Sequence, residues 1–116
     1  MLNTVALAGR ITQTPTLQQT SGNVSYVRFN IACDRDYRQA DNQRGTDFIP
    51  CMAWRQTAEF VSKYFEKGSA IIITGRLEVN SWKTPDGEQR REMLVSVDDV
   101  YFGESRSKEN PAPQKV

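Results

Sequence analysis

The sequence predicts an all-β domain with a single helix, and three observations carry that prediction. Apolar and polar residues alternate with a period of two over several stretches, turn residues separate these stretches, and helical spacing of apolar residues occurs once. The chain has 116 residues, of which 38% are hydrophobic. That length suits one domain with one core and is too short for two.

The first half of the chain alternates over three stretches, each of which is expected to form a strand. Gly9 indicates a bend or bulge in the first strand, and Pro50 indicates an edge or bulge in the third. Turn residues at 20–23 precede the second strand, and a polar loop is expected over 34–46. The three strands are predicted over residues 1–13, 24–33 and 47–54.

The single helical pattern follows the third strand, with Thr57 as its expected N-cap and Lys67-Gly68 as its stop. The apolar residues at helical spacing are Ala58, Phe60, Val61, Tyr64 and Phe65. The three aromatic residues among them, Phe60, Tyr64 and Phe65, are expected to lie in the core together with Phe29.

A long hairpin ends the predicted fold. One strand is expected over 70–83, the turn at Pro85-Asp86-Gly87, a return strand over 89–97, and a short closing strand over 100–102. This order favours a five-stranded Greek-key barrel of the OB type, in which the helix lies between strands 3 and 4 and plugs one end. A two-sheet sandwich is the alternative, although it would not need the helix. The domain is expected to span residues 1–103. Residues 104–116 lack periodicity and are expected to form a disordered tail.

Composition makes catalysis and metal binding poor explanations of this chain. Histidine is absent, so no Ser-His or Cys-His nucleophile pair exists, and no enzyme is expected. Cys33 and Cys51 have no CxxC spacing, which favours free thiols over a zinc site. Asp98 and Asp99 are neighbours on an expected strand and therefore point to opposite faces. No cofactor is predicted.

The charge balance predicts little about partners. Fifteen basic residues face fourteen acidic ones, so any attraction for nucleic acid must come from local placement of charge. Ten of the fifteen cations are arginine, which suits bidentate phosphate contacts and stacking. The sequence has no apolar run of membrane length and no signal-peptide pattern, so a cytoplasmic protein without membrane contact is expected.

Aromatic residues on polar faces are the informative feature. Trp82 shares its parity with Arg76, opposite an expected core set of Ile73, Leu77 and Val79. A tryptophan on a polar face indicates a contact surface, although it could instead pack against its own hairpin. Tyr37 lies in the polar loop between arginines. Such rings could stack any base, which would give sequence-tolerant binding of single strands.

The parity of the third strand leaves its orientation open. Phe48, Pro50, Met52 and Trp54 share one face, and Ile49, Cys51 and Ala53 share the other. Either set could form the core, and if the first set does, Ile49 and Cys51 would lie at a subunit contact. Spacing alone therefore does not decide whether Phe48 and Trp54 face outward.

Several segments together resemble the bacterial single-stranded DNA-binding protein family, over about residues 1–103. The first is Asn3-Thr4-Val5-Ala6-Leu7-Ala8-Gly9-Arg10-Ile11-Thr12, followed by Pro15. The others are Asp47-Phe48-Ile49-Pro50-Cys51 with Trp54-Arg55, Ala58-Glu59-Phe60, Tyr64-Phe65-Glu66-Lys67-Gly68-Ser69, and Gly75-Arg76-Leu77 through Trp82 to Asp86-Gly87. The run from the third strand to the glycine after the helix is the most specific part.

This resemblance implies an OB fold that assembles as a homotetramer and binds single-stranded DNA during replication, recombination, repair or DNA uptake, in the cytoplasm at the nucleoid. The family's stacking aromatics fall on Tyr37, Phe48, Trp54 and Trp82, which orients the third strand with Phe48 and Trp54 outward. Its phosphate-contacting positions fall on Arg10, Arg35, Arg55 and Arg76.

The chain departs from the family in three respects. It has Glu78 and Asn80 where members often carry basic residues, and Met93-Leu94 in place of a Thr-Glu step. The acidic, hydrophobic tip of the family's long tail is missing, so recruitment of repair and replication proteins through it is not expected. A primosome-type OB-fold module, which binds mainly another protein and DNA only secondarily, is therefore the alternative.

Overall fold

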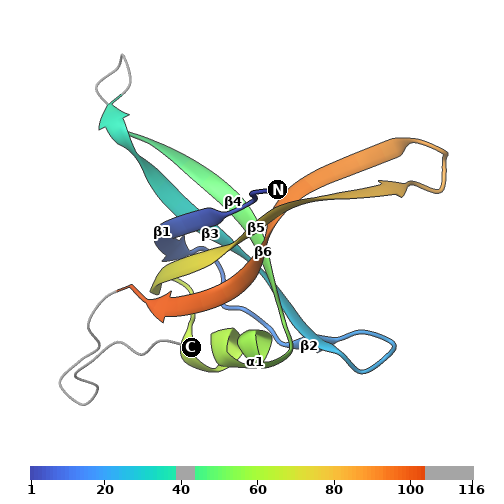
Figure 1. Ribbon diagram of the computed structural model, residues 1–116, viewed down its shortest axis with the longest axis horizontal. Coiled ribbons are helices and arrows are strands. Elements are labelled where there is room, and N and C mark those ends of the chain that lie inside the picture. The colour runs from blue at the N-terminus through green and yellow to red at the C-terminus, as the bar shows by residue number, and fades with distance from the viewer. Residues whose placement is uncertain (39–43, 104–116) are drawn as a thin grey trace.

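The strands and the helix of the chain follow one another as Figure 1 shows. The computed structural model describes the backbone of residues 1–38 and 44–103, and the side chains of residues 1–36 and 45–103. The elements are β1 (Val5–Ile11), β2 (Gln18–Gln19), β3 (Ser25–Arg38), β4 (Arg44–Trp54), α1 (Arg55–Tyr64), β5 (Ala70–Lys83) and β6 (Gln89–Phe102). The tail expected over 104–116 lies outside the described residues.

Five of these strands close into a barrel. The order β1-β5-β6-β4-β3 is completed by pairing of β3 with β1, and only the β4–β6 pair is parallel. The short β2 pairs with the outer part of β3. This closed ring, with α1 between the third and fourth barrel strands, confirms the OB-type barrel and excludes the two-sheet sandwich.

The core draws side chains from the barrel strands and from α1. The alternation of each strand turns its apolar residues inward, where Val27, Ile31 and Ile73 are fully buried. The helix contributes Ala58 and Val61, and after it the Phe65 ring stacks on Phe102 with 5.1 Å between ring centroids. Further members of the cluster are Ile11, Phe29, Cys51, Ala53, Ile71, Val95, Val97 and Val100.

Three expected core positions are wrong, two of them because β5 continues past the end of the barrel. Leu77 and Val79 share parity with Ile73, but both are exposed on the part of β5 that extends beyond the barrel, as Figure 1 shows for the long β5–β6 hairpin. Tyr64 at the end of α1 is also exposed rather than buried, and Phe60 is only partly buried.

Gly9 and Gly75 occupy places where neighbouring backbones approach closely. A Cβ on Gly9 would lie 2.3 Å from the carbonyl oxygen of Ala32, and one on Gly75 would lie 2.2 Å from that of Ser96. At Gly9 the ladder with β5 continues in register, so the strand has no bulge there, and close approach of β3 accounts for the glycine.

The return strand and the closing strand are one continuous strand, β6. Thr74 pairs with Asp99 and Gly75 with Val97, so Asp98 is the extra residue of a β-bulge. Before the bulge the core residue is Val97, and after it the next one is Val100. The residues that face the core therefore change from odd to even numbers. The prediction of two strands was wrong because the alternation appears interrupted there.

The expected polar loop over 34–46 was also too long. β3 continues to Arg38 and β4 begins at Arg44. Backbone pairing and a hydrogen bond from Thr46 Oγ1 to Asp34 Oδ1, 2.8 Å long, join the two strands there without a buried face. Alternation of buried apolar residues therefore could not reveal this part of the ladder.

The helix begins two residues before the expected N-cap. β4 runs directly into α1, so Trp54 is the N-cap, without a side-chain cap, and Arg55 adopts a left-handed φ of 58°. Thr57 consequently lies within the first turn. The helix ends at Tyr64, ahead of Gly68, which follows in a turn with a φ of +89°. In the described residues, no helix has the length and apolar character needed to cross a membrane.

Candidate nucleic-acid interface

Four neighbouring strands present one continuous outer face. The pairing registers align Arg76 of β5, Ser96 of β6, Met52 of β4 and Arg28 of β3 in a row across the sheet. Paired residues point to the same side of a sheet, so residues at even spacing from this row share its face until a bulge intervenes. We call this surface the outer face; its members on β4 are Phe48, Pro50, Met52 and Trp54.

The orientation of β4 is resolved by burial. Cys51 and Ala53 are buried in the core, whereas the side chains of Phe48 and Trp54 are 67% and 39% exposed. The reading in which Phe48 and Trp54 form the core is therefore wrong. Ile49 packs against the core and does not offer a separate contact surface.

Trp54 is supported by a second aromatic residue on the neighbouring strand. Tyr26 pairs with Trp54 across β3 and β4, and their ring centroids lie 5.4 Å apart with 38° between the planes. The hydroxyl of Tyr26 donates a hydrogen bond of 2.9 Å to Oε1 of Gln18. Tyr26 is not among the predicted site residues, because its register opposite Trp54 cannot be read from the sequence.

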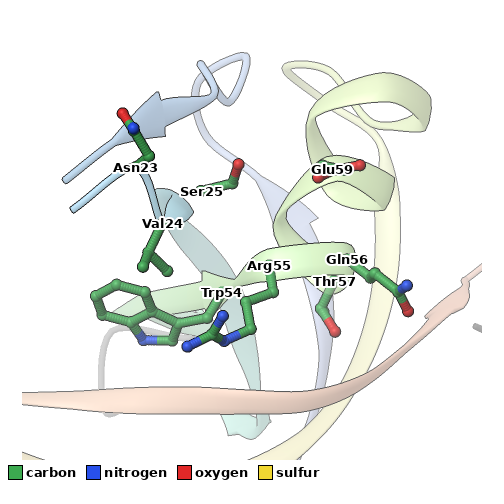
Figure 2. Close-up of a pocket in the computed structure, with 8 residues that line it drawn as sticks. All are labelled: Asn23, Val24, Ser25, Trp54, Arg55, Gln56, Thr57 and Glu59. Atoms are coloured by element: carbon green, nitrogen blue, oxygen red, sulfur yellow. The ribbon is translucent and has the colours of Figure 1, made fainter.

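A pocket of about 580 Å³ adjoins Trp54 at the start of α1, as Figure 2 shows. The Trp54 ring and the Arg55 side chain both line it, and the first turn of α1, with Gln56 and Thr57, forms another wall. The structure thus brings a ring and a guanidinium group, both predicted site residues, into one concave site.

Trp82 lies on the outer face of the long hairpin. Its side chain is 47% exposed and sits directly opposite Arg90 in the β5–β6 ladder. Arg76 lies on the same face six residues earlier, where its Nη2 is 3.5 Å from Oε2 of Glu78. Nearly half of the surface of Trp82 remains open to solvent, so packing against its own hairpin leaves part of this residue available for contact.

The predicted arginines of β1 and β3 lie on different sides. Arg10 pairs with Ala32, which pairs with Phe48, so Arg10 belongs to the outer face. Its Nη1 donates a hydrogen bond of 2.9 Å to the carbonyl oxygen of Gly68. Arg35 instead contacts Asp47, a residue of the opposite parity to Phe48. The structure therefore does not bring Arg35 together with the outer aromatic rings.

The contact between Arg35 and Asp47 is charge-assisted. Arg35 donates from Nη2 to Oδ1 at 2.9 Å and from Nε to Oδ2 at 3.1 Å. These hydrogen bonds, with the positive charge of Arg35, hold the pKa of Asp47 below its ordinary value, against a smaller opposing effect of desolvation.

Tyr37 belongs to β3 by its backbone, but its side chain lies outside the described part of the chain. The structure therefore gives no position for this predicted stacking ring.

The two cysteines are both free, and they differ in burial. Burial, with a smaller contribution from Cys33, raises the pKa of the Cys51 thiol to about 12. Burial also raises the pKa of Cys33, followed by the charges of Asp47 and Asp34. Among the described residues, no group of acidic, cysteine or histidine side chains is arranged to hold a metal ion.

Comparison with known proteins gives one consistent family. A family model described as the single-strand binding protein family matches residues 2–103. The single-stranded DNA-binding protein of Fusobacterium nucleatum is 37% identical over 108 residues, which cover 91% of this chain and 70% of that protein. That of Caldanaerobacter subterraneus is 36% identical over 92% of this chain and 71% of its own length. Single-stranded DNA-binding protein 1 of Lactococcus lactis is 34% identical over 99% of this chain and 77% of its own.

Proposed function

Because the chain belongs to the single-strand binding protein family, we propose that it binds single-stranded DNA without regard to sequence, by stacking bases on exposed rings. The supporting observation is that Phe48, Trp54 and Trp82 are exposed on one four-stranded face. Tyr37, whose side chain is not described, is the fourth ring of the proposal.

Stacking suits this surface for a physical reason. Every base has an aromatic face, so a ring that accepts one base accepts all four, and each stacked base contributes roughly 1–3 kcal/mol. Rings carried on hydrogen-bonded strands lose little freedom on binding, and Tyr26 further restrains Trp54.

Arginines are proposed to contact the phosphates between the stacked bases. Arg55 lines the pocket beside Trp54, and Arg10 and Arg76 lie on the outer face with the rings. Arg35, also proposed from the resemblance, would engage DNA only on the other side of the β3–β4 ribbon. The net charge of +1 means that these local contacts, rather than a broadly basic surface, supply the attraction.

The chain offers a direct test because it contains two tryptophans, both in the proposed site. The Trp54→Phe and Trp82→Phe variants each leave one tryptophan to report on one place. Titration with oligo-dT at low salt is expected to quench the emission of both variants. Trp82→Ala should weaken binding by roughly 1–3 kcal/mol per occupied site.

Matched titrations with duplex DNA and RNA define the ligand class. Absence of quenching in both single-tryptophan variants at low salt would overturn the proposal. Quenching of one variant alone would exclude the other tryptophan from the stacking surface.

The cellular setting completes the proposal. We place this non-catalytic binding in replication, recombination, repair or DNA uptake, in the cytoplasm at the nucleoid. We also propose a homotetramer, because the long hairpin exposes Leu77, Val79 and Met93 on the face opposite Trp82. Exposed apolar side chains grouped on one face suit contact with another copy of the chain.

A further inference from the structure

Arg28 lies in the middle of the outer face, but an acidic residue of the same chain holds it. Its Nη2 donates to both carboxylate oxygens of Glu92, at 2.9 Å to Oε1 and 2.8 Å to Oε2. The two side chains are 44% and 32% exposed, so the pair is only partly screened by solvent.

This ion pair crosses a strand. Arg28 belongs to β3 and Glu92 to β6, and β4 lies between these two strands in the sheet. Both side chains line a pocket of about 240 Å³, together with Asn30 and Pro50. The contact therefore spans the outer face itself and is not a local pairing of neighbours on one strand.

The place of Arg28 relative to the rings gives the pair its importance. Tyr26, two residues earlier on β3, contacts Trp54, and Arg28 itself pairs with Met52 beside Trp54 on β4. A strand that stacks a base on Trp54 and continues along the sheet toward Trp82 would bring its phosphates past this guanidinium group. Glu92, four residues before Ser96 on β6, stands on the same path.

A carboxylate at this place opposes phosphate binding in two ways. While the pair is intact, the carboxylate of Glu92 cancels the charge that Arg28 would offer. The negative charge of Glu92 also repels a nearby phosphate. If a phosphate displaces Glu92, the freed carboxylate attracts a cation from solution, which reduces the net release of ions that drives binding.

We infer that Glu92 is an internal competitor of DNA phosphate for Arg28 and thereby limits the affinity of the outer face for single-stranded DNA. This inference rests on the proposed function. It assigns to Glu92 an effect on affinity and salt dependence, acting through Arg28, and it gives Arg28 a place among the phosphate-binding residues.

The test uses the Glu92→Gln variant, which removes the charge and keeps the shape of the side chain. Oligo-dT affinity is expected to rise several-fold at low salt. The log–log salt slope should steepen by about 0.7, so that the advantage shrinks about 5-fold for each tenfold rise in salt. Glu66→Gln, which removes the same charge from the exposed segment after α1, controls for net charge and should change neither quantity.

The Arg28→Gln background tests the route of the effect. Glu92→Gln is expected to give a much smaller gain there than in the wild-type chain. Equal gains in both backgrounds, or no gain in the wild-type chain, would overturn the inference. A loss of affinity in Glu92→Gln, with an unchanged thermal midpoint, would show instead that Glu92 positions Arg28 for DNA and would also overturn it.

The controls separate this inference from the function on which it rests. Wild-type binding without a gain in Glu92→Gln contradicts only the competition between Glu92 and phosphate. Failure of the wild-type chain to bind oligo-dT contradicts the proposed function itself.

Discussion

Gly75 lies at the bulge where β5 and β6 change register. Because Gly75 has no side chain, the carbonyl oxygen of Ser96 can approach its backbone closely. A Cβ added to Gly75 would lie only 2.2 Å from that oxygen. Gly75→Ala is therefore expected to lower the free energy of unfolding by about 3 kcal/mol, the upper range for overpacking of a close-packed interior. Urea denaturation followed by tryptophan fluorescence would measure this change.

Gly22 supplies the matched control, because a Cβ there would meet only Oγ1 of Thr20, at 3.8 Å. Gly22→Ala should leave stability within about 0.5 kcal/mol of the wild-type chain. Equal effects of the two substitutions would show that close approach of β6 does not explain the glycine at position 75.

Parity on a strand was enough to predict an exposed Trp82, whereas Phe48 and Trp54 also needed the family resemblance. Phe48, Trp54 and Trp82 are exposed as expected, but spacing alone left the orientation of β4 open until the family resemblance was used. The partners of Tyr26 and Arg28 could not be predicted, because Tyr26 meets Trp54 only in the particular register of β3 on β4, and Arg28 meets Glu92 across an intervening strand. Such contacts depend on the register between strands, which no local pattern contains.

At the level of elements, the side chain of Asn3 extends the ladder between β1 and β5. The Asn3 Nδ2 donates a hydrogen bond of 2.8 Å to the carbonyl oxygen of Leu77, and the Leu77 N–H donates one of 2.9 Å to the Asn3 Oδ1. The amide group thus substitutes for a backbone pair at the point where the long hairpin leaves the barrel.

Asn3→Ala should loosen this attachment, because it removes both hydrogen bonds, with a local loss of about 1 kcal/mol. Hydrogen exchange is expected to accelerate at the Leu77 amide and to stay unchanged at Ile73, inside the barrel. Thr4→Ala, at the exposed neighbouring position, serves as the control and should accelerate neither amide. Uniform acceleration of both amides in Asn3→Ala would instead indicate loss of the whole barrel.

Elements were predictable from sequence where one face of a strand is buried throughout or turn residues set its ends. β5 has the expected bounds, Ala70–Lys83, because a continuous apolar run over 70–73 begins it and the Pro85-Asp86-Gly87 turn follows it. β6 was divided wrongly because the bulge at Asp98 reverses its parity. The start of α1 was misplaced because the strand enters the helix through a left-handed residue, Arg55, rather than through a polar cap.

For the whole molecule, the exposed apolar face of the hairpin predicts assembly. Light scattering is expected to give the wild-type chain four times the mass of a single chain. The double variant Val79→Lys with Met93→Lys, which places charges at two directly opposite positions of the hairpin, should have a smaller mass. Asn80→Lys adds the same kind of charge to the other face of the hairpin and should leave the mass unchanged.

Two outcomes would contradict this assembly. A single-chain mass for the wild-type protein would remove the tetramer, and with it any path of DNA from one copy to the next. An unchanged mass in the double variant would mean that the hairpin does not form the contact between copies.

The parallel seam between β4 and β6 has a consequence for how the chain is made. The outer face combines two strands from the first half of the chain with two from the second, and only two residue pairs of β6 on β4 join them. During synthesis, β3 and β4 leave the ribosome well before β6, with Phe48 and Trp54 already present but no sheet to hold them beside Trp82. The four-stranded outer face can therefore be completed only after β6 has been synthesised.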